Sequence, residues 1–219
     1  MAGIPASQEK SKLLPVAAPG FEHVKRYWDP GCDRWSAKIL PGEYFVTRSD
    51  EAITTVLGSC IAACMRDPVT RIGGMNHFML PEDGSSGKSS WTEGPEGLAT
   101  RYGSYAMESL INELMKLGAR RDRLEVKLFG GGRILSSMTD VGQKNIRFAR
   151  DFLKLEGFKI AAEDVGDVYP RRVLYFPATG VVMLKRLRAL DVTAIAQREN
   201  IYQSRLTAKP AGDDVELFE

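Results

Sequence analysis

Residues 54–80 read TTVLGSCIAACMRDPVTRIGGMNHFML, and this stretch decides how the middle of the chain folds. Two short apolar runs, CIAACMR and IGGMNHFML, stand on either side of the turn residues Asp67-Pro68-Val69-Thr70. Apolar runs of this length, bounded by turn residues, are typical of buried β-strands. The stretch therefore predicts a β-hairpin whose turn is centred between Pro68 and Val69.

Further strands are predicted on both sides of this hairpin, in the segments GEYFVT, AITTVL, LEVKLF, FKIAAE, RVLYF and VVMLKR. Two segments carry apolar residues at helical spacing and end at a glycine, one closing at Gly118 and the other at Gly157. A third helix is expected after Asp191, a good N-cap residue. Strands interrupted by so few helices predict an α+β fold, with mixed or antiparallel β-sheets packed against flanking helices.

The length of 219 residues suits one well-buried core with tails. Residues 1–40 mix proline, glycine and charge without a sustained period, and we expect an irregular N-terminal extension there. Residues 41–190 should form the folded domain, with a Gly- and Ser-rich surface loop at 83–97. Residues 191–219 are expected to form a C-terminal helix and a tail.

Composition narrows the function classes. The chain has 30 basic and 28 acidic side chains, a formal charge of +2, so it offers no electrostatic footprint for nucleic acid. No apolar run reaches the length of about 20 residues that spans a bilayer, so no membrane insertion is expected. The N-terminus also lacks the charged and apolar regions of a secretory signal. These features predict a cytoplasmic location.

Cys60 and His77 lie equally far from the centre of the predicted turn, so this register places them opposite each other on one face of the hairpin. Such partners have Cβ atoms about 4.5–5.5 Å apart, close enough for a thiol and an imidazole to interact. An imidazole that accepts the thiol proton yields a thiolate able to attack a carbonyl carbon. A bulge at the Gly73-Gly74 dipeptide would shift the register by one residue and separate the pair.

Structural interpretations of the same residues remain open. The apolar neighbourhood of Cys60 also suits a buried structural cysteine, and His77 also suits a core histidine. The Gly58-Ser59 dipeptide favours catalysis, because a tight turn there would aim backbone N–H groups at a developing oxyanion. If the pair forms, Cys60 should be alkylated faster than Cys64, which is expected in the core, or Cys32, which is assigned no role.

Thr54 and Thr55 stand in the strand before Cys60, where β-branched residues are common for packing reasons alone. Either hydroxyl could instead orient the imidazole of His77. A hydroxyl is neutral, so it would position the base without stabilising an imidazolium as a carboxylate does. The sequence leaves the choice between the two threonines open.

Metal and nucleotide sites are not favoured. Cys60, Cys64 and His77 fit no familiar zinc spacing and lack an evident fourth ligand. The glycines that begin at Gly130 lack the Lys-Ser/Thr of a phosphate-binding loop. We therefore predict no metal and no cofactor.

The chain resembles the CheD family of chemoreceptor glutamine deamidases over roughly residues 41–188. The resemblance rests on PGEYFVT, TTVLGSC, RDP, GGMNHFMLP, RYGSYAME, LEVKLFGGG, GQKNIRF and PRRVLYFPATGVV, in this order. It implies a nucleophile at Cys60, a base at His77 and a third site residue at Thr54. It also implies a fold similar to that of bacterial toxins that deamidate glutamine, with β-sheets flanked by helices.

The resemblance further implies an enzyme, a protein-glutamine glutaminase that converts glutamine to glutamate on the cytoplasmic domains of methyl-accepting chemotaxis receptors and so supports sensory adaptation. Some relatives are restrained by a CheC-type phosphatase, which would be a second partner. The chain departs from the family pattern at Asp167, where a glycine is usual, and in its longer N-terminal extension. Two alternatives are a non-catalytic adaptor that binds receptors or a CheC-type phosphatase, and a cysteine hydrolase of another specificity.

Overall fold

The computed structural model describes residues 13–81, 98–134, 141–187 and 192–208. Its strands form two five-stranded sheets. Sheet A has the order β1 (Lys25–Asp29), β2 (Arg34–Lys38), β4 (Ala52–Leu57), β9 (Arg171–Phe176) and β10 (Val181–Arg186). Sheet B has the order β3 (Tyr44–Thr47), β6 (Gly73–Asn76), β5 (Ile61–Arg66), β7 (Glu125–Gly130) and β8 (Ile160–Val165).

Both sheets are mixed, which confirms the predicted α+β class. The pairs β2–β4 and β7–β8 are parallel, and the other neighbouring strands are antiparallel. The α-helices are α1 (Leu98–Lys116), α2 (Val141–Leu155) and α3 (Val192–Ala208), and a short 3-10 helix η1 covers Arg121–Arg123. Among the described residues, no helix is long and apolar enough to span a bilayer.

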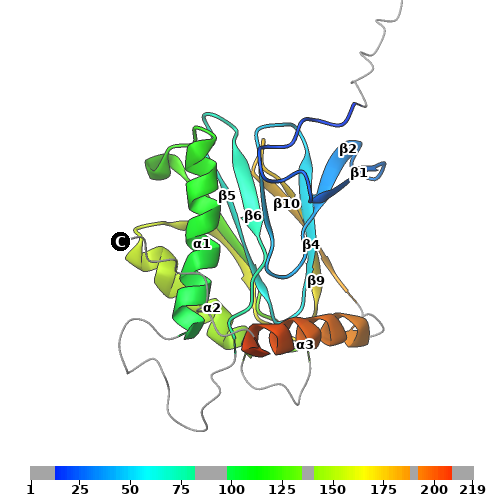
Figure 1. Cartoon of the computed structure of the whole chain (residues 1–219), viewed down its shortest axis with the longest axis vertical. Helices are drawn as coiled ribbons and strands as arrows, with labels where there is room; N and C mark the ends of the chain where they lie inside the picture. The colour runs from blue at the N-terminus through cyan, green and yellow to red at the C-terminus, as the bar shows by residue number, and fades with distance from the viewer. Residues whose placement is uncertain (1–12, 82–97, 135–140, 188–191, 209–219) are drawn as a thin grey trace, which may run out of the picture.

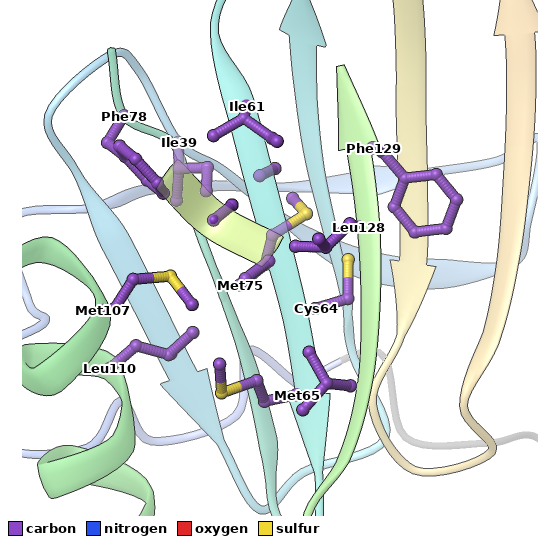
Figure 2. Packing of buried hydrophobic residues seen from close by; sticks show 14 of the residues in the cluster. Ile39, Ile61, Cys64, Met65, Met75, Phe78, Met107, Leu110, Leu128 and Phe129 are labelled. Atoms are coloured by element: carbon purple, nitrogen blue, oxygen red, sulfur yellow. The ribbon is translucent and has the colours of Figure 1, made fainter. Parts of the chain in front are cut away.

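The elements form three layers, with α1 and α2 on one face of sheet B and sheet A on the other (Figure 1). The burial of β5 agrees with this arrangement. Every residue from Ile61 to Met65 is buried, and successive strand residues point to opposite faces, so both faces of β5 are covered. Figure 2 shows part of this core, where Met107 and Leu110 of α1 lie beside the sheet. Helix α3 lies across one end of the sheets (Figure 1).

The hairpin forms as expected, but its register differs by two residues. Asp67 N–H donates to the carbonyl of Ile72, and the carboxylate of Asp67 accepts from Val69 N–H (2.9 Å). This side-chain capping starts the turn at Asp67 and moves its centre toward the C-terminus. Ile61 therefore faces Phe78. Continuing that register places Met79 opposite Cys60. No bulge occurs at Gly73, which pairs regularly with Arg66.

A shift of two residues preserves the face on which each side chain lies, whereas a shift of one would reverse it. His77 therefore remains on the same face as Cys60, as its diagonal neighbour. Diagonal neighbours on a sheet are about 7–8 Å apart, within reach of long side chains. The expected pairing of Cys60 with His77 on one face survives, although the two residues are not directly opposed.

The prediction of an irregular extension over residues 1–40 is wrong for its second half, because β1 and β2 lie there. These strands form a hairpin in which Trp28 faces Trp35, with ring centroids 6.0 Å apart in an edge-to-face arrangement. Strand β2 then pairs with β4. The charged residues of KRYWD and RWSAK obscure the strand pattern in the sequence. In the folded protein, the β1–β2 hairpin is stabilised by the pairing of β2 with β4.

The third predicted helix is present as α3. The loop predicted at 83–97 and the tail after residue 208 lie outside the described residues, as does the proposed cap Asp191. The first half of α3 packs through a small cluster in which Ile195 and Ala196 contact Ile134, and Tyr202 further along packs against the main core. This cluster is separate from the main core.

Candidate active site

Cys60, His77 and Glu199 form one buried group, in which a ligand-type atom from each side chain lies within 4.8 Å of the others. Cys60 directly precedes β5, His77 directly follows β6, and Glu199 is on α3. Two of the three residues predicted from the sequence therefore meet, and they meet a carboxylate that sequence reasoning did not anticipate.

The turn formed by residues 58–60 is fixed through its carbonyl groups. In chain order, its three carbonyl oxygens accept hydrogen bonds from Gly132 N–H (2.7 Å), the side-chain amide of Asn145 (2.8 Å) and Gly131 N–H (2.7 Å). The chain can approach this closely because Gly130 has φ +115° and no side chain, whereas a Cβ there would collide with the carbonyl of Cys60. The glycine-rich segment after β7 thus holds turn 58–60 in place through its backbone N–H groups.

The N–H groups of the same turn all face α3. The carboxylate of Glu199 accepts hydrogen bonds from the N–H groups of Gly58 (2.9 Å), Ser59 (2.9 Å) and Cys60 (3.3 Å). It also accepts from the Ser59 hydroxyl at 2.6 Å. Successive N–H groups that point in one direction form a binding site for an anionic oxygen. Such donors suit the oxyanion of an acyl-transfer reaction, as the Gly58-Ser59 dipeptide suggested.

Thr55, rather than Thr54, contacts the imidazole. The Thr55 hydroxyl lies 2.7 Å from Nδ1 of His77 and donates to the carbonyl of Ile39 at 2.9 Å. The Thr54 hydroxyl instead donates to the carbonyl of Val173 at 2.9 Å. Neighbouring strand residues point to opposite faces, so only one of the two threonines can face His77. The structure does not bring Thr54 to the imidazole.

The hydroxyl of Thr55 also fixes the tautomer of His77. A hydroxyl has one hydrogen, and here that hydrogen is directed to the carbonyl of Ile39. Nδ1 of His77 must then donate to the hydroxyl oxygen, which leaves Nε2 as an acceptor with a free lone pair. Nε2 is buried and has no hydrogen-bond partner among the residues that the structure describes. The imidazole is therefore prepared to accept a proton.

Burial determines the protonation states in this closed arrangement. It raises the pKa of the Cys60 thiol well above its ordinary value, and the charge of Glu199 and a hydrogen bond to it raise this pKa further. Burial lowers the pKa of His77 to about 3. Both shifts favour a neutral thiol beside a neutral imidazole. We therefore expect the half-exposed Cys32 to be alkylated before Cys60, the reverse of the order expected from sequence.

Cys64 lies in the core on β5, as predicted (Figure 2). Burial raises the pKa of its thiol. Cys64 is not part of any group of potential metal ligands among the described residues. The Cys60, His77 and Glu199 group has the residue types of a metal site, but both oxygens of Glu199 already accept from the turn. Its donor set fits a carboxylate-binding turn better than a metal site.

Sequence reasoning missed two residues of this site. Asn145 lies on the apolar face of α2, one turn before Ala149, where an unpaired amide would be costly to bury. It donates to Ser59 and accepts from Leu80 N–H at 2.9 Å. Glu199 likewise lies on the buried face of α3, one turn after Ile195. A polar residue at an apolar helical position is the signal that could have revealed both.

Comparison with known proteins agrees with this site. A family model described as CheD chemotactic sensory transduction matches residues 79–186. Proteins named probable chemoreceptor glutamine deamidase CheD align over nearly the whole chain. The protein of Hahella chejuensis is 49% identical over 97% of this chain and 99% of its own length. Those of Halorhodospira halophila and Hydrogenovibrio crunogenus are 46% and 54% identical, over 97% and 87% of this chain and 98% and 97% of their own lengths.

The chain belongs to the CheD family. Membership makes one departure from the family pattern interpretable. Asp167 has φ +66°, in the left-handed region where glycine is favoured, and its carbonyl accepts from Arg133 N–H at 2.7 Å. Aspartate tolerates this conformation better than most residues, and its carboxylate accepts from Val168 N–H at 2.7 Å. Asp167 therefore adopts a backbone conformation that also suits glycine.

Proposed function

We propose that the chain is a chemoreceptor glutamine deamidase in which Cys60 is the nucleophile and His77 the general base. The observation that carries this proposal is the buried meeting of the two side chains beside the N–H groups of turn 58–60. A cysteine, an imidazole and oriented N–H donors are the parts that acyl transfer requires. The names of the relatives supply the substrate class, protein glutamine on chemoreceptors.

The imidazole is the proton acceptor in this scheme. Nε2 of His77 takes the proton of the Cys60 thiol, while Thr55 holds Nδ1 and so maintains the required tautomer. Thr55 is a positioning residue in this proposal. The role that the family resemblance gave to Thr54 passes to its neighbour.

The chemistry then follows acyl transfer. The thiolate of Cys60 forms a bond to the carboxamide carbon, and the N–H groups of turn 58–60 hold the oxyanion. His77 returns its proton to the nitrogen, the C–N bond breaks, and ammonia leaves. Water hydrolyses the thioester, which yields glutamate and restores the thiol. A cavity of about 40 Å³ lined by Thr55, His77 and Glu199 leaves room for one water beside the base.

The partners and the location follow from this reaction. CheD relatives are named for action on chemoreceptors, so receptor cytoplasmic domains are the proposed partners. A CheC-type phosphatase is proposed as a second partner on the family resemblance alone. We place the reaction in the cytoplasm, where three free cysteines would stay reduced.

The test is incubation of the protein with receptor cytoplasmic fragments, followed by ammonia measurement and mass spectrometry of glutamine-to-glutamate conversion. Cys60→Ala should bind the fragments without converting them, and Cys64→Ala, a matched change on the same strand face, should still convert them. Binding without conversion by the native chain would favour the adaptor alternative. Conversion by Cys60→Ala would remove Cys60 from its proposed role.

A further inference from the structure

The C-terminal helix places a glutamate side chain at the reacting centre. Glu199 is 2% exposed, and its two oxygens accept the three N–H groups of turn 58–60 and the Ser59 hydroxyl. Four donors on two oxygens satisfy a carboxylate, which has about four acceptor positions. Glutamate is also the product of the proposed reaction, and its carboxylate would need the same donors.

We propose that α3 is an intramolecular occupant of the substrate site, with Glu199 held where the side chain of a substrate glutamine reacts. The inference rests on the proposed function, because a glutamate side chain is the reaction product only if the protein deamidates glutamine. It assigns Ser59 and the turn N–H groups as the pocket for the substrate carboxamide. It also requires that α3 move away before a receptor glutamine can enter.

The attachment of α3 suits a removable occupant. Ile195 and Ala196 pack with Ile134 in a cluster separate from the main core. Further along the helix, the half-buried Tyr202 packs against the edge of the main core, and its hydroxyl contacts that of Tyr102 on α1. Elements held by few apolar contacts open locally at lower free energy than the core.

The charge arrangement favours the same interpretation. Among the described residues, no Lys or Arg forms an ion pair with Glu199, so the carboxylate is satisfied by turn 58–60 rather than by a cation. A helix stabilised only for structure has no need of a carboxylate on its buried face, since burying such a group is costly. A metal site would need oxygens that the turn already occupies. An occupant that resembles the reaction product explains both why residue 199 is a glutamate and why its carboxylate accepts from the N–H groups of turn 58–60.

The first test measures access to Cys60 by time-resolved alkylation with peptide mapping, and needs no receptor. Glu199→Ala should increase the alkylation rate of Cys60 at least about tenfold relative to Cys64, which serves as the buried internal reference. Asn200→Ala, which removes an exposed side chain from the same helix, should leave this ratio unchanged. Ile195→Asp, which weakens docking while retaining the carboxylate, should also raise it. An unchanged ratio in both Glu199→Ala and Ile195→Asp overturns the proposal.

The second test converts the occupant into a substrate. Glu199→Gln places a carboxamide at the pocket, and Cys60 with one water should convert it to a carboxylate and ammonia. Mass spectrometry should find this conversion in Glu199→Gln but not in Glu199→Gln/Cys60→Ala. The exposed Gln197 on the same helix is the internal control and should remain unchanged.

The two proposals fail in distinguishable ways. The occupant proposal is wrong, and the deamidase proposal stands, if the native chain converts receptor glutamines but two results are negative. These are no conversion of the carboxamide in Glu199→Gln, and no change in the Cys60 to Cys64 alkylation ratio in Glu199→Ala and Ile195→Asp. If receptor glutamines are never converted but Glu199→Ala and Ile195→Asp expose Cys60, α3 does cover the site and the deamidase proposal is wrong. An increase in receptor conversion by Glu199→Ala supports both.

Discussion

Turn 58–60 and helix α3 meet where the side chains of Cys60, His77 and Glu199 come together, but the turn and the helix are attached to the rest of the protein in different ways. Every carbonyl of the turn is bonded to the scaffold, and Cys60 belongs to the main core. Helix α3 instead packs through a small separate cluster and through the half-buried Tyr202 at the edge of the main core, together with polar contacts. The difference indicates that turn 58–60, which carries the proposed nucleophile, is held more firmly than α3, the proposed occupant of the site. Changes in the turn should therefore affect chemistry, and changes in α3 should affect access.

The largest expected effect comes from the nucleophile itself. Cys60→Ala should reduce deamidation of receptor fragments by about a thousandfold or more, because only the oxyanion and positioning contributions remain. The fold should persist, since the carbonyls of the turn keep their partners. Cys64→Ala should remain active and lose on the order of 1 kcal/mol of stability through the lost core volume. Activity assays and urea denaturation measure the two effects.

The second expected effect tests how firmly the turn is held. Asn145→Ala removes the amide that joins Ser59 to Leu80 and leaves two buried backbone groups unpaired. The free energy of unfolding should fall by about 1–3 kcal/mol, and activity should fall at least about tenfold because the oxyanion donors lose their fixed position. The control is Asn200→Ala, at an exposed position of α3, which should lower the free energy of unfolding by less than about 0.5 kcal/mol. Equal losses in the two variants would contradict the difference between the regions.

The third prediction concerns pH, because His77 lies buried beneath α3. Its folded pKa of about 3 is below the ordinary value of roughly 6.5. As pH falls between these values, the unfolded chain binds a proton that the folded chain excludes, so the free energy of unfolding falls by up to about 1.4 kcal/mol per pH unit. His77→Gln should remove this slope, whereas His23→Gln, at an exposed histidine, should retain it. Urea denaturation across this pH window measures the slope, and a native chain without it would show that His77 is not buried in the neutral form.

The smallest expected effect separates the two threonines of β4. Thr55→Val removes the hydroxyl between His77 and Ile39, and we expect kcat to fall by several-fold to about tenfold as the base loses its orientation. Thr54→Val removes a hydroxyl that donates to the carbonyl of Val173 and accepts from the side chain of Arg172, and it should leave kcat nearly unchanged. Both variants should lose about 1–2 kcal/mol of stability, since each hydroxyl takes part in two hydrogen bonds. The opposite order of the two kcat values would return the positioning role to Thr54.

Much of this architecture was predictable from local patterns. Apolar or alternating runs located strands β3 to β10, helical spacing located α1 and α2, and the N-cap residue Asp191 pointed to α3. The strands β1 and β2 were missed because their pattern is weak and they depend on pairing with β4. The register of the hairpin was misjudged by two residues because the side chain of Asp67, rather than the position of Pro68, starts the turn.

The sequence by itself predicted that Cys60 and His77 share a face, and this prediction holds because the register in the structure is shifted by two residues, which preserves the alternation of a strand. It also identified the family, through motifs whose order is independent of geometry. Only the tertiary structure showed which threonine contacts the imidazole of His77, which groups Asn145 bonds in the core, and that Glu199 lies beside Cys60. Those contacts join segments up to 141 residues apart in the chain, as between Gly58 and Glu199. No local pattern specifies such a meeting, because it depends on how whole layers and a terminal helix pack together.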